Sequence, residues 1–234
     1  MKTVLILGAS SDIGVEVTKL FLLKNFNVIA HYNKNINGLK KIKNKQLKLF
    51  KFNLLKINNF EKYVKKNKIF NNIDIFISLT GYLKIRELTQ TSINDFYNHI
   101  NVNYLSNFIV TKKIISNMQK KKWGRILYAS SIGTKFGGSK NSFVYSLSKF
   151  MNEFFPKPFK YLNKTNILIN TLKIGLTNTK LNKVDKNKNM KKRIKLIPLG
   201  RMASINEVVK YIDFLTSENN SLITNEVINI SGGE

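Results

Sequence analysis

Near its N-terminus the chain reads Thr3-Val4-Leu5-Ile6-Leu7-Gly8-Ala9-Ser10-Ser11-Asp12-Ile13-Gly14. The apolar run Thr3–Leu7 predicts a buried strand, and the residues from Gly14 onward have the spacing of a helix. Gly8 allows a tight turn off the strand, and Gly14 lets the helix pack closely on the sheet. Free N–H groups at a helix start bind phosphate, so this stretch predicts a dinucleotide-binding turn. The residues expected at the pyrophosphate are Gly8, Ser10, Ser11, Asp12, Ile13 and Gly14.

Short apolar runs alternate with longer amphipathic segments along the rest of the chain. The expected strands are Thr3–Leu7, Asn27–Ala30, Leu47–Phe52, Ile73–Ser78, Arg125–Ser130, Asn166–Leu172 and Glu226–Ile230. The expected helices include Gly14–Lys24, Asn94–Met118, Tyr145–Asn163 and Ile205–Thr216. This alternation predicts an α/β fold, a doubly wound parallel sheet of the Rossmann type, as one catalytic domain over residues 1–234. The polar, lysine-rich stretch near 177–197 is expected to be a lid-like excursion.

Composition excludes several classes of protein. The chain has 234 residues, 43% of them hydrophobic, which is enough for a sizeable buried core. We expect no membrane segment, since no apolar run approaches the roughly 20 residues that cross a bilayer. The first strand starts almost at once, which leaves no room for a signal peptide. Cysteine is absent, so disulfides and thiolate chemistry are excluded, and the expected location is the cytoplasm. We expect no metal site.

The net charge of +27 raises the question of nucleic-acid binding. Only four of the 40 basic residues are arginine, whereas nucleic-acid sites usually use arginine and aromatic residues at one localised place. We therefore favour a solvated lysine coat and expect no nucleic-acid partner. Such a coat can still attract anionic ligands by raising the local potential.

The identity of the cofactor is indicated by missing acidic residues. Sites that prefer NAD place an acidic side chain roughly 20 residues beyond the glycines, on the ribose hydroxyls. No Asp or Glu occurs between Glu16 and Glu61, and the second strand leads into Asn33 and Lys34, which could meet a 2′-phosphate. NADP(H) is therefore favoured over NAD(H), although acidic residues are scarce throughout, 13 in all.

The catalytic hypothesis starts from Tyr145-Ser146-Leu147-Ser148-Lys149, which puts a phenol and an ammonium on one face of a helix. An unperturbed tyrosine titrates near pH 10, and a neighbouring ammonium is expected to lower that pKa. Ahead of this pair, a predicted strand ends in Ser130 and Ser131. Ligands of open α/β sheets bind beyond the carboxyl ends of the strands, so these side chains are expected at one site.

At this point the sequence resembles the classical short-chain dehydrogenase/reductase family over essentially its whole length, and within it the 3-oxoacyl-[acyl-carrier-protein] reductases. The resemblance implies that Tyr145 exchanges the proton, Lys149 binds the nicotinamide ribose, Ser131 binds the substrate oxygen and Asn103 holds a water. Ser130 competes with Ser131 for its role, and Ser131 could simply cap a turn. Five motifs in order carry the resemblance, and they are Gly8…Gly14, Asn103, Ser131, Tyr145…Lys149 and the C-terminal Pro198–Arg201 with Ser231–Gly233.

The resemblance also implies cofactor contacts outside the phosphate turn. They fall on Asn53, Gly81, Tyr145, Lys149, Gly175 and Thr177, in addition to Asn33 and Lys34 after the second strand. Asp12 departs from the family, which has a glycine there, so its carboxylate must point away from the pyrophosphate or bind an amide. Pro156 and Pro158 fall inside the predicted helix Tyr145–Asn163 and predict a kink or a break.

Several functions stay open at this stage. The favoured one is an NADP-dependent oxidoreductase that moves hydride between NADPH and a ketone or secondary alcohol. Its substrate could be a 3-oxoacyl thioester on an acidic carrier protein or coenzyme A, drawn to the lysine-rich lid, or else a sugar or secondary-metabolite ketone. The alternative is a non-catalytic nucleotide sensor of the same fold. The family resemblance implies a homo-oligomer, a tetramer or a dimer, in which the helix after Lys149 packs against a neighbouring subunit.

Overall fold

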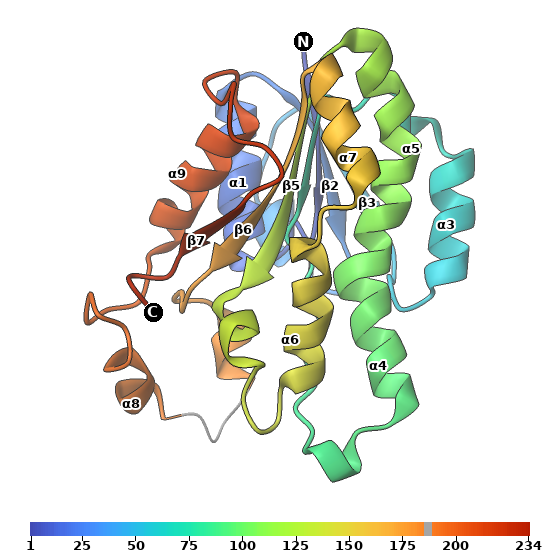
Figure 1. The fold of residues 1–234 in the computed structure, drawn as a ribbon. Coiled ribbons are helices and arrows are strands. Elements are labelled where there is room, and N and C mark those ends of the chain that lie inside the picture. Colours follow the sequence, from blue (N-terminus) through green and yellow to red (C-terminus); the bar gives the residue numbers. More distant parts are fainter. Residues whose placement is uncertain (185–188) are drawn as a thin grey trace.

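Seven parallel strands form one sheet in the computed structural model of the chain, which describes residues 1–184 and 189–234. The strands are β1 (Thr3–Leu7), β2 (Asn27–Tyr32), β3 (Leu47–Lys51), β4 (Ile75–Ser78), β5 (Gly124–Ser131), β6 (Ile167–Ile174) and β7 (Val227–Ile230). Their order across the sheet is β3-β2-β1-β4-β5-β6-β7 (Figure 1). The predicted doubly wound sheet is confirmed, and every predicted strand is present within two residues of its expected bounds.

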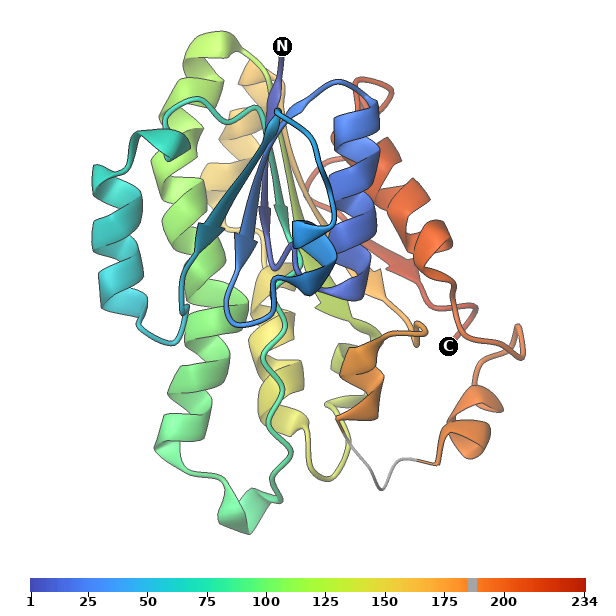
Figure 2. The ribbon, with the colours of Figure 1, turned by 180° about the vertical axis from the view of Figure 1, so that it is seen from behind.

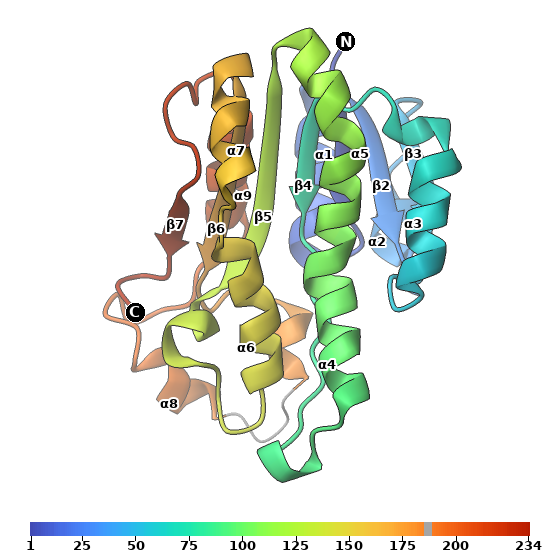
Figure 3. The same ribbon diagram turned by 45° about the vertical axis from the view of Figure 1, so that its right-hand side comes forward.

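Helices cover both faces of the sheet. They are α1 (Asp12–Leu23), α2 (Asn37–Lys40), α3 (Ile57–Lys66), α4 (Ile93–Ile100), α5 (Ser106–Lys121), α6 (Phe143–Phe150), α7 (Lys157–Leu162), α8 (Met190–Ile194) and α9 (Ile205–Thr216). The helices α3, α5 and α7 lie on one face (Figure 3), and α1 and α9 lie side by side on the other (Figure 2). Each face is a separate apolar core, because consecutive side chains of a strand point to opposite sides.

The first strand shows why its sequence is uniformly apolar. Leu5 and Leu7 pack among the side chains of α3 and α5, whereas Val4 and Ile6 pack among those of α1 and α9. All of them are fully buried. A parallel strand covered on both faces has no solvent side, so it reads as a continuous apolar run.

The predicted helix Asn94–Met118 is divided into α4, a π-helical turn at Asn101–Leu105 and α5. A π turn holds one more residue than an α turn, and here it carries the fully buried Asn103. The predicted helix Tyr145–Asn163 also breaks, as Pro156 and Pro158 indicated. Its first part is α6, which continues into a 3-10 turn at Met151–Glu153. The second part is α7, which starts directly after Pro156.

From β1 to β3 each new strand is added toward one edge of the sheet, and from β4 to β7 toward the other edge. The strand order therefore reverses between β1 and β4, which are neighbours. Loops that leave these strands on opposite faces open a crevice at their carboxyl ends. The predicted lid contains a 3-10 turn at Lys180–Lys183 and the short α8; its residues 185–188, with Lys186 and Lys188, lie outside the described residues. Over the described ranges, no helix has the length and apolarity to cross a membrane.

Candidate active site

The turn that was predicted to bind phosphate requires both of its glycines. Gly8 has a φ of +73°, and a Cβ there would lie 2.7 Å from the backbone oxygen of Leu79. A Cβ on Gly14 would lie 2.6 Å from the backbone oxygen of Gly8. The Ser11 hydroxyl caps α1 by accepting from the Gly14 N–H at 3.1 Å. The chain therefore passes close to the residue that follows β4, and the helix that starts after the turn is the one expected to hold a phosphate.

His31, near the end of β2, binds the backbone of this turn. Its Nδ1 accepts from the Gly8 N–H at 3.2 Å, and its Nε2 lies 3.0 Å from the Phe52 carbonyl oxygen, to which it donates. Burial lowers the pKa of His31 to about 4, so the ring is neutral at physiological pH. Sequence reasoning missed this residue; its position at the end of the second strand was the available signal.

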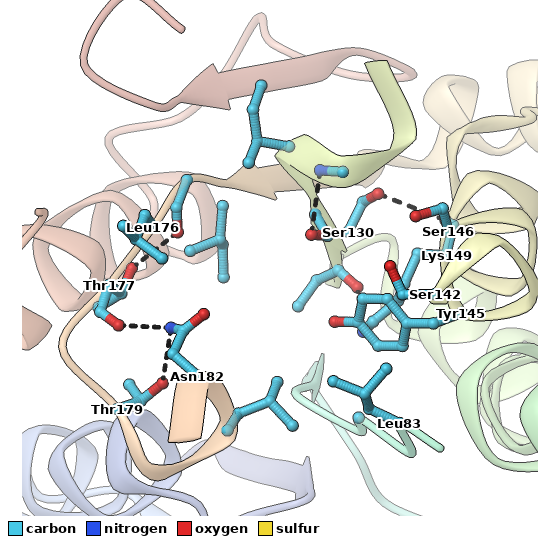
Figure 4. A pocket seen from close by; sticks show the side chains of 18 of the residues that line it. Leu83, Ser130, Ser142, Tyr145, Ser146, Lys149, Leu176, Thr177, Thr179 and Asn182 are labelled. Carbon is cyan, nitrogen blue, oxygen red and sulfur yellow. Dashed lines mark hydrogen bonds between the residues drawn. The ribbon is translucent and has the colours of Figure 1, made fainter. Parts of the chain in front are cut away.

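A cavity of about 1020 Å³ opens at the carboxyl ends of the strands (Figure 4). It lies beside the turn after β1 and reaches the lid on its far side. It brings together most of the residues predicted for the site. Those that line it are Ser10, Ser11, Asp12, Ile13, Gly81, Ser131, Tyr145, Lys149, Gly175 and Thr177.

Other predicted residues have a different place. At the end of β2, Asn35 lines the cavity, whereas its neighbours Asn33 and Lys34 are not among the lining residues. The Asn53 side chain accepts from the Leu55 N–H at 3.1 Å and so caps its own turn. Asn103 lies behind the cavity wall, where it is fully buried.

Tyr145 projects from α6, and its hydroxyl points into the cavity (Figure 4). Burial raises the pKa of Tyr145 to about 12, and a hydrogen bond with Ser131 acts in the opposite direction. The expectation that Lys149 depresses this pKa is therefore wrong for this structure, because desolvation of the phenolate outweighs every other effect. At neutral pH, Tyr145 keeps its proton.

Lys149 lies one helical turn further along α6 and is 3% exposed. Its Nζ donates to the backbone oxygens of Thr80 at 2.6 Å and Ala129 at 2.8 Å, and lies 5.9 Å from the centre of the Tyr145 ring. Burial lowers the pKa of Lys149 to about 7. The ammonium is thus only partly charged at neutral pH, which further weakens its influence on Tyr145.

The two candidate serines at the end of β5 have different partners. The Ser130 hydroxyl donates to the Glu153 carboxylate at 2.6 Å and is committed to that contact. The Ser131 hydroxyl accepts from the Gly133 N–H at 3.2 Å and faces Tyr145. The geometry thus favours Ser131 over Ser130 as the serine that meets a substrate.

Asn103 connects the π turn to α6. Its Nδ2 donates to the Tyr82 carbonyl oxygen at 3.0 Å and to the Ser148 hydroxyl at 2.9 Å, and its Oδ1 accepts from the Tyr82 N–H at 2.7 Å. Its backbone oxygen accepts from Asn107 and Asn152. Asn103 thus braces the helix that carries Tyr145, and the buried Asn152 is a partner that sequence reasoning missed.

The Asp12 carboxylate, whose negative charge departs from the family pattern, binds a backbone amide. Its Oδ2 accepts from the backbone N–H of Lys180 at 2.7 Å. The sequence required this carboxylate to point away from the pyrophosphate or to bind an amide, and the second outcome is confirmed. The contact joins the phosphate turn to the lid.

Known proteins resemble this chain over nearly its whole length. A family model described as short chain dehydrogenase matches residues 2–190. A 3-oxoacyl-[acyl-carrier-protein] reductase of Buchnera aphidicola subsp. Schizaphis graminum is 30% identical over 240 residues, which cover 99% of this chain and 96% of that protein. An uncharacterised oxidoreductase of Bacillus subtilis is 26% identical over 99% of this chain and 98% of its own length.

Solved structures show the same fold. ElxO with NADP bound matches with a TM-score of 0.84 and 25% identity, covering 99% of this chain and 98% of that one. A 3-oxoacyl (acyl-carrier-protein) reductase from Agrobacterium tumefaciens with NADP bound has a TM-score of 0.85 at 20% identity, covering 100% and 94% of the two chains. This chain belongs to the short chain dehydrogenase family and is an NAD(P)-dependent oxidoreductase.

Proposed function

We propose that the protein reduces a ketone with NADPH and that Tyr145, Ser131 and Lys149 are its catalytic residues. One observation carries the proposal. The three side chains line the same cavity as the glycine turn after β1, although they come from β5 and α6. A dinucleotide that lies on the turn would extend toward them.

The described residues fit a nicotinamide dinucleotide. The glycine cradle at Gly8 and Gly14 leaves no room for a side chain, and the start of α1 would hold the pyrophosphate. Lys149 would hold the nicotinamide ribose, and Gly81, Gly175 and Thr177 line the same cavity. When bound, the nicotinamide supplies the hydride that reaches the carbonyl carbon.

The protein's own part in the reaction is to bind the carbonyl oxygen and give it a proton. Since its pKa is raised to about 12, the Tyr145 phenol is protonated at neutral pH and serves as the acid of a reduction. The Ser131 hydroxyl holds the same oxygen. Lys149, when protonated, favours the phenolate that remains after the proton leaves. Asn103 fixes the position of α6; its amide and its backbone oxygen are already bound by other residues, so we do not assign it the water of a proton relay.

The preference for NADPH over NADH rests on charge. Asn33, Lys34 and Asn35 follow β2, and no acidic residue lies between Glu16 and Glu61 to repel a 2′-phosphate. We infer that Lys34 and Asn35 bind that phosphate. Asn53, whose side-chain oxygen caps its own turn, is kept as a proposed cofactor contact through its amide group.

For the substrate we propose a 3-oxoacyl thioester. Part of the cavity lining is apolar and includes Leu83, Ile85, Leu176 and Leu196, which suits an acyl chain. The lid carries exposed lysines on α8, which would attract the phosphates of coenzyme A or an acidic carrier protein. The relative from Buchnera is named for such a substrate.

The proposed assembly is a homo-oligomer. Phe108 on α5 and Leu147, Phe150 and Phe154 on and after α6 are large apolar side chains that are 45% to 68% exposed. They lie on neighbouring helices of one face, where a second copy would cover them. Sedimentation of the purified protein tests this, since a monomer would contradict it.

The function is tested by the oxidation of NADPH with acetoacetyl-coenzyme A, followed at 340 nm. The wild-type chain is expected to turn over. Tyr145→Phe is expected to lose roughly 100-fold or more in kcat, the contribution of a general acid, while binding NADPH as tightly as before. A Tyr145→Phe variant with a near-native rate would disprove the proposed acid.

A further inference from the structure

The end of the catalytic helix contains a buried acid that the proposed mechanism does not use. Glu153 lies four residues beyond Lys149 and eight beyond Tyr145, so the series Tyr145, Lys149, Glu153 repeats at the spacing of a helix face. Glu153 ends the 3-10 turn that continues α6, and its side chain is only 7% exposed. A carboxylate in such a place needs partners.

Two of its partners flank Ser131. The Glu153 Oε1 accepts from the Ser130 hydroxyl at 2.6 Å and from the Thr134 hydroxyl at 2.7 Å. Thr134 Oγ1 also lies 2.9 Å from the backbone oxygen of Ser131 itself. One carboxylate oxygen therefore holds the chain on both sides of the serine that faces the substrate.

The third partner comes from the neighbouring strand. The Nζ of Lys173 lies 2.8 Å from the Glu153 Oε2, and the Lys173 side chain is 16% exposed. Lys173 stands beside Ser130 in the register of β5 and β6. Replacing a buried ion pair by apolar side chains is often neutral or stabilising, so stability alone does not account for this arrangement.

We propose that Glu153 is a positioning residue, which fixes the turn Ile132–Phe136 and with it the Ser131 hydroxyl relative to Tyr145. The inference rests on the proposed function. Glu153 does not touch the reacting atoms; it joins the catalytic helix to the end of β5, and Lys173 makes its burial possible. The carboxylate thus sets the distance between the groups that share the carbonyl oxygen.

The test replaces the ion pair in two ways. Glu153→Leu/Lys173→Met substitutes an apolar pair and removes the acceptor of Ser130 and Thr134. Glu153→Gln/Lys173→Met also removes both charges but keeps an acceptor oxygen. Asp74→Asn is the matched control. Asp74 binds Lys121 Nζ at 2.6 Å and directly precedes β4, so this ion pair lies at the amino ends of the strands, away from the cavity.

The leucine variant is expected to lose roughly tenfold or more in kcat, as small misplacements near a reacting centre do, with the Kd of NADPH unchanged. The glutamine variant should recover most of this loss, and Asp74→Asn should show none. Hydrogen exchange of residues 131–137 in the cofactor-free protein is the second measurement. It should accelerate in the leucine variant and stay near wild-type in the glutamine variant.

The outcomes separate the two ideas. A wild-type chain without NADPH oxidation contradicts the proposed function, and the exchange rates then decide the positioning role alone. The positioning role is overturned if the leucine variant keeps wild-type kcat and hydrogen exchange. It is also overturned if both double variants lose activity equally. If the leucine variant does not fold, Thr134→Val removes one of the two turn contacts, and wild-type kcat and exchange in that variant would overturn the proposal.

Discussion

The carboxylate of Asp12 accepts a hydrogen bond from the backbone N–H of Lys180 at 2.7 Å, so the phosphate-binding turn is joined directly to the start of the lid. The Lys180 ammonium adds little, since it lies 3.6 Å from the other oxygen and its side chain is 80% exposed. For a dinucleotide bound as proposed, Asp12 would have two opposing effects. It would hold the lid near the turn, and it would place a negative charge beside the phosphates.

The substitution Asp12→Asn separates these effects, because an amide oxygen still accepts from Lys180 while the charge is gone. We expect Asp12→Asn to lower the Kd of NADPH about fivefold at low salt, from the loss of roughly 1 kcal/mol of repulsion. The gain should shrink as salt is added. Fluorescence titration of NADPH at two salt concentrations measures it.

Asp12→Ala is the matched control for the lid contact. It removes both the charge and the acceptor, so hydrogen exchange at residues 179–182 should accelerate in Asp12→Ala and not in Asp12→Asn. Weaker NADPH binding by Asp12→Asn would mean that the carboxylate assists the phosphates and does not oppose them.

His31 is expected to make the fold sensitive to mild acid. Its pKa is about 4 in the folded chain and near 6.5 in the unfolded chain, so between these values the unfolded state binds more protons. The free energy of unfolding should therefore fall as the pH drops from 6.5 toward 4, by about 1 kcal/mol per pH unit from this group. Urea unfolding across this range measures the slope.

The control for this prediction is His31→Gln, which cannot titrate. The carboxylates and His99 contribute equally to both proteins, so the difference in unfolding free energy between wild type and variant isolates His31. That difference should narrow steadily as the pH falls from 6.5. A constant difference across the range would contradict a buried, neutral imidazole.

The parts of this molecule that follow local rules could be predicted from the sequence. The run Thr3–Leu7 with Gly8 and Gly14 has one compatible structure, a buried strand that turns tightly into a helix. The order of Ser131, Tyr145 and Lys149 along the chain likewise indicated a shared site, because parallel strands end at one edge.

The contacts that the sequence did not reveal join segments that are far apart in it. Nothing near Asn103 predicts a π turn, and the partners of its amide, Tyr82 and Ser148, lie far from it in the sequence. The pKa of Tyr145 was misjudged for a related reason. The helical spacing indicated that an ammonium lies near the phenol. The desolvation that raises the pKa of Tyr145 depends on the whole fold around the phenol, which the spacing does not show.

Lys149 is expected to give NADPH binding a pH dependence near neutrality. Its pKa of about 7 means that the ammonium is charged below this pH and neutral above it. The charged form binds ribose hydroxyls and the anionic cofactor more strongly, so the Kd of NADPH should rise as the pH increases from 6 to 8.5. Lys149→Met should bind more weakly at pH 6 and show no change over this interval. A parallel rise in both proteins would assign the titration to another group.

At Gly8 in the turn after β1, backbone conformation and space both exclude a side chain. Gly200 provides the control, since its φ is +67° but a Cβ there would meet nothing within 4 Å. Gly8 has a similar φ of +73°, and a Cβ there would also lie 2.7 Å from the Leu79 oxygen. Gly200→Ala is expected to cost about 1 kcal/mol of unfolding free energy, from its left-handed backbone alone. Gly8→Ala is expected to cost roughly 2 kcal/mol beyond that, because β4 must move, and to abolish NADPH binding. Urea unfolding and fluorescence titration check both variants. Equal losses of stability in the two would show that the turn after β1 lies further from β4 than the structure places it.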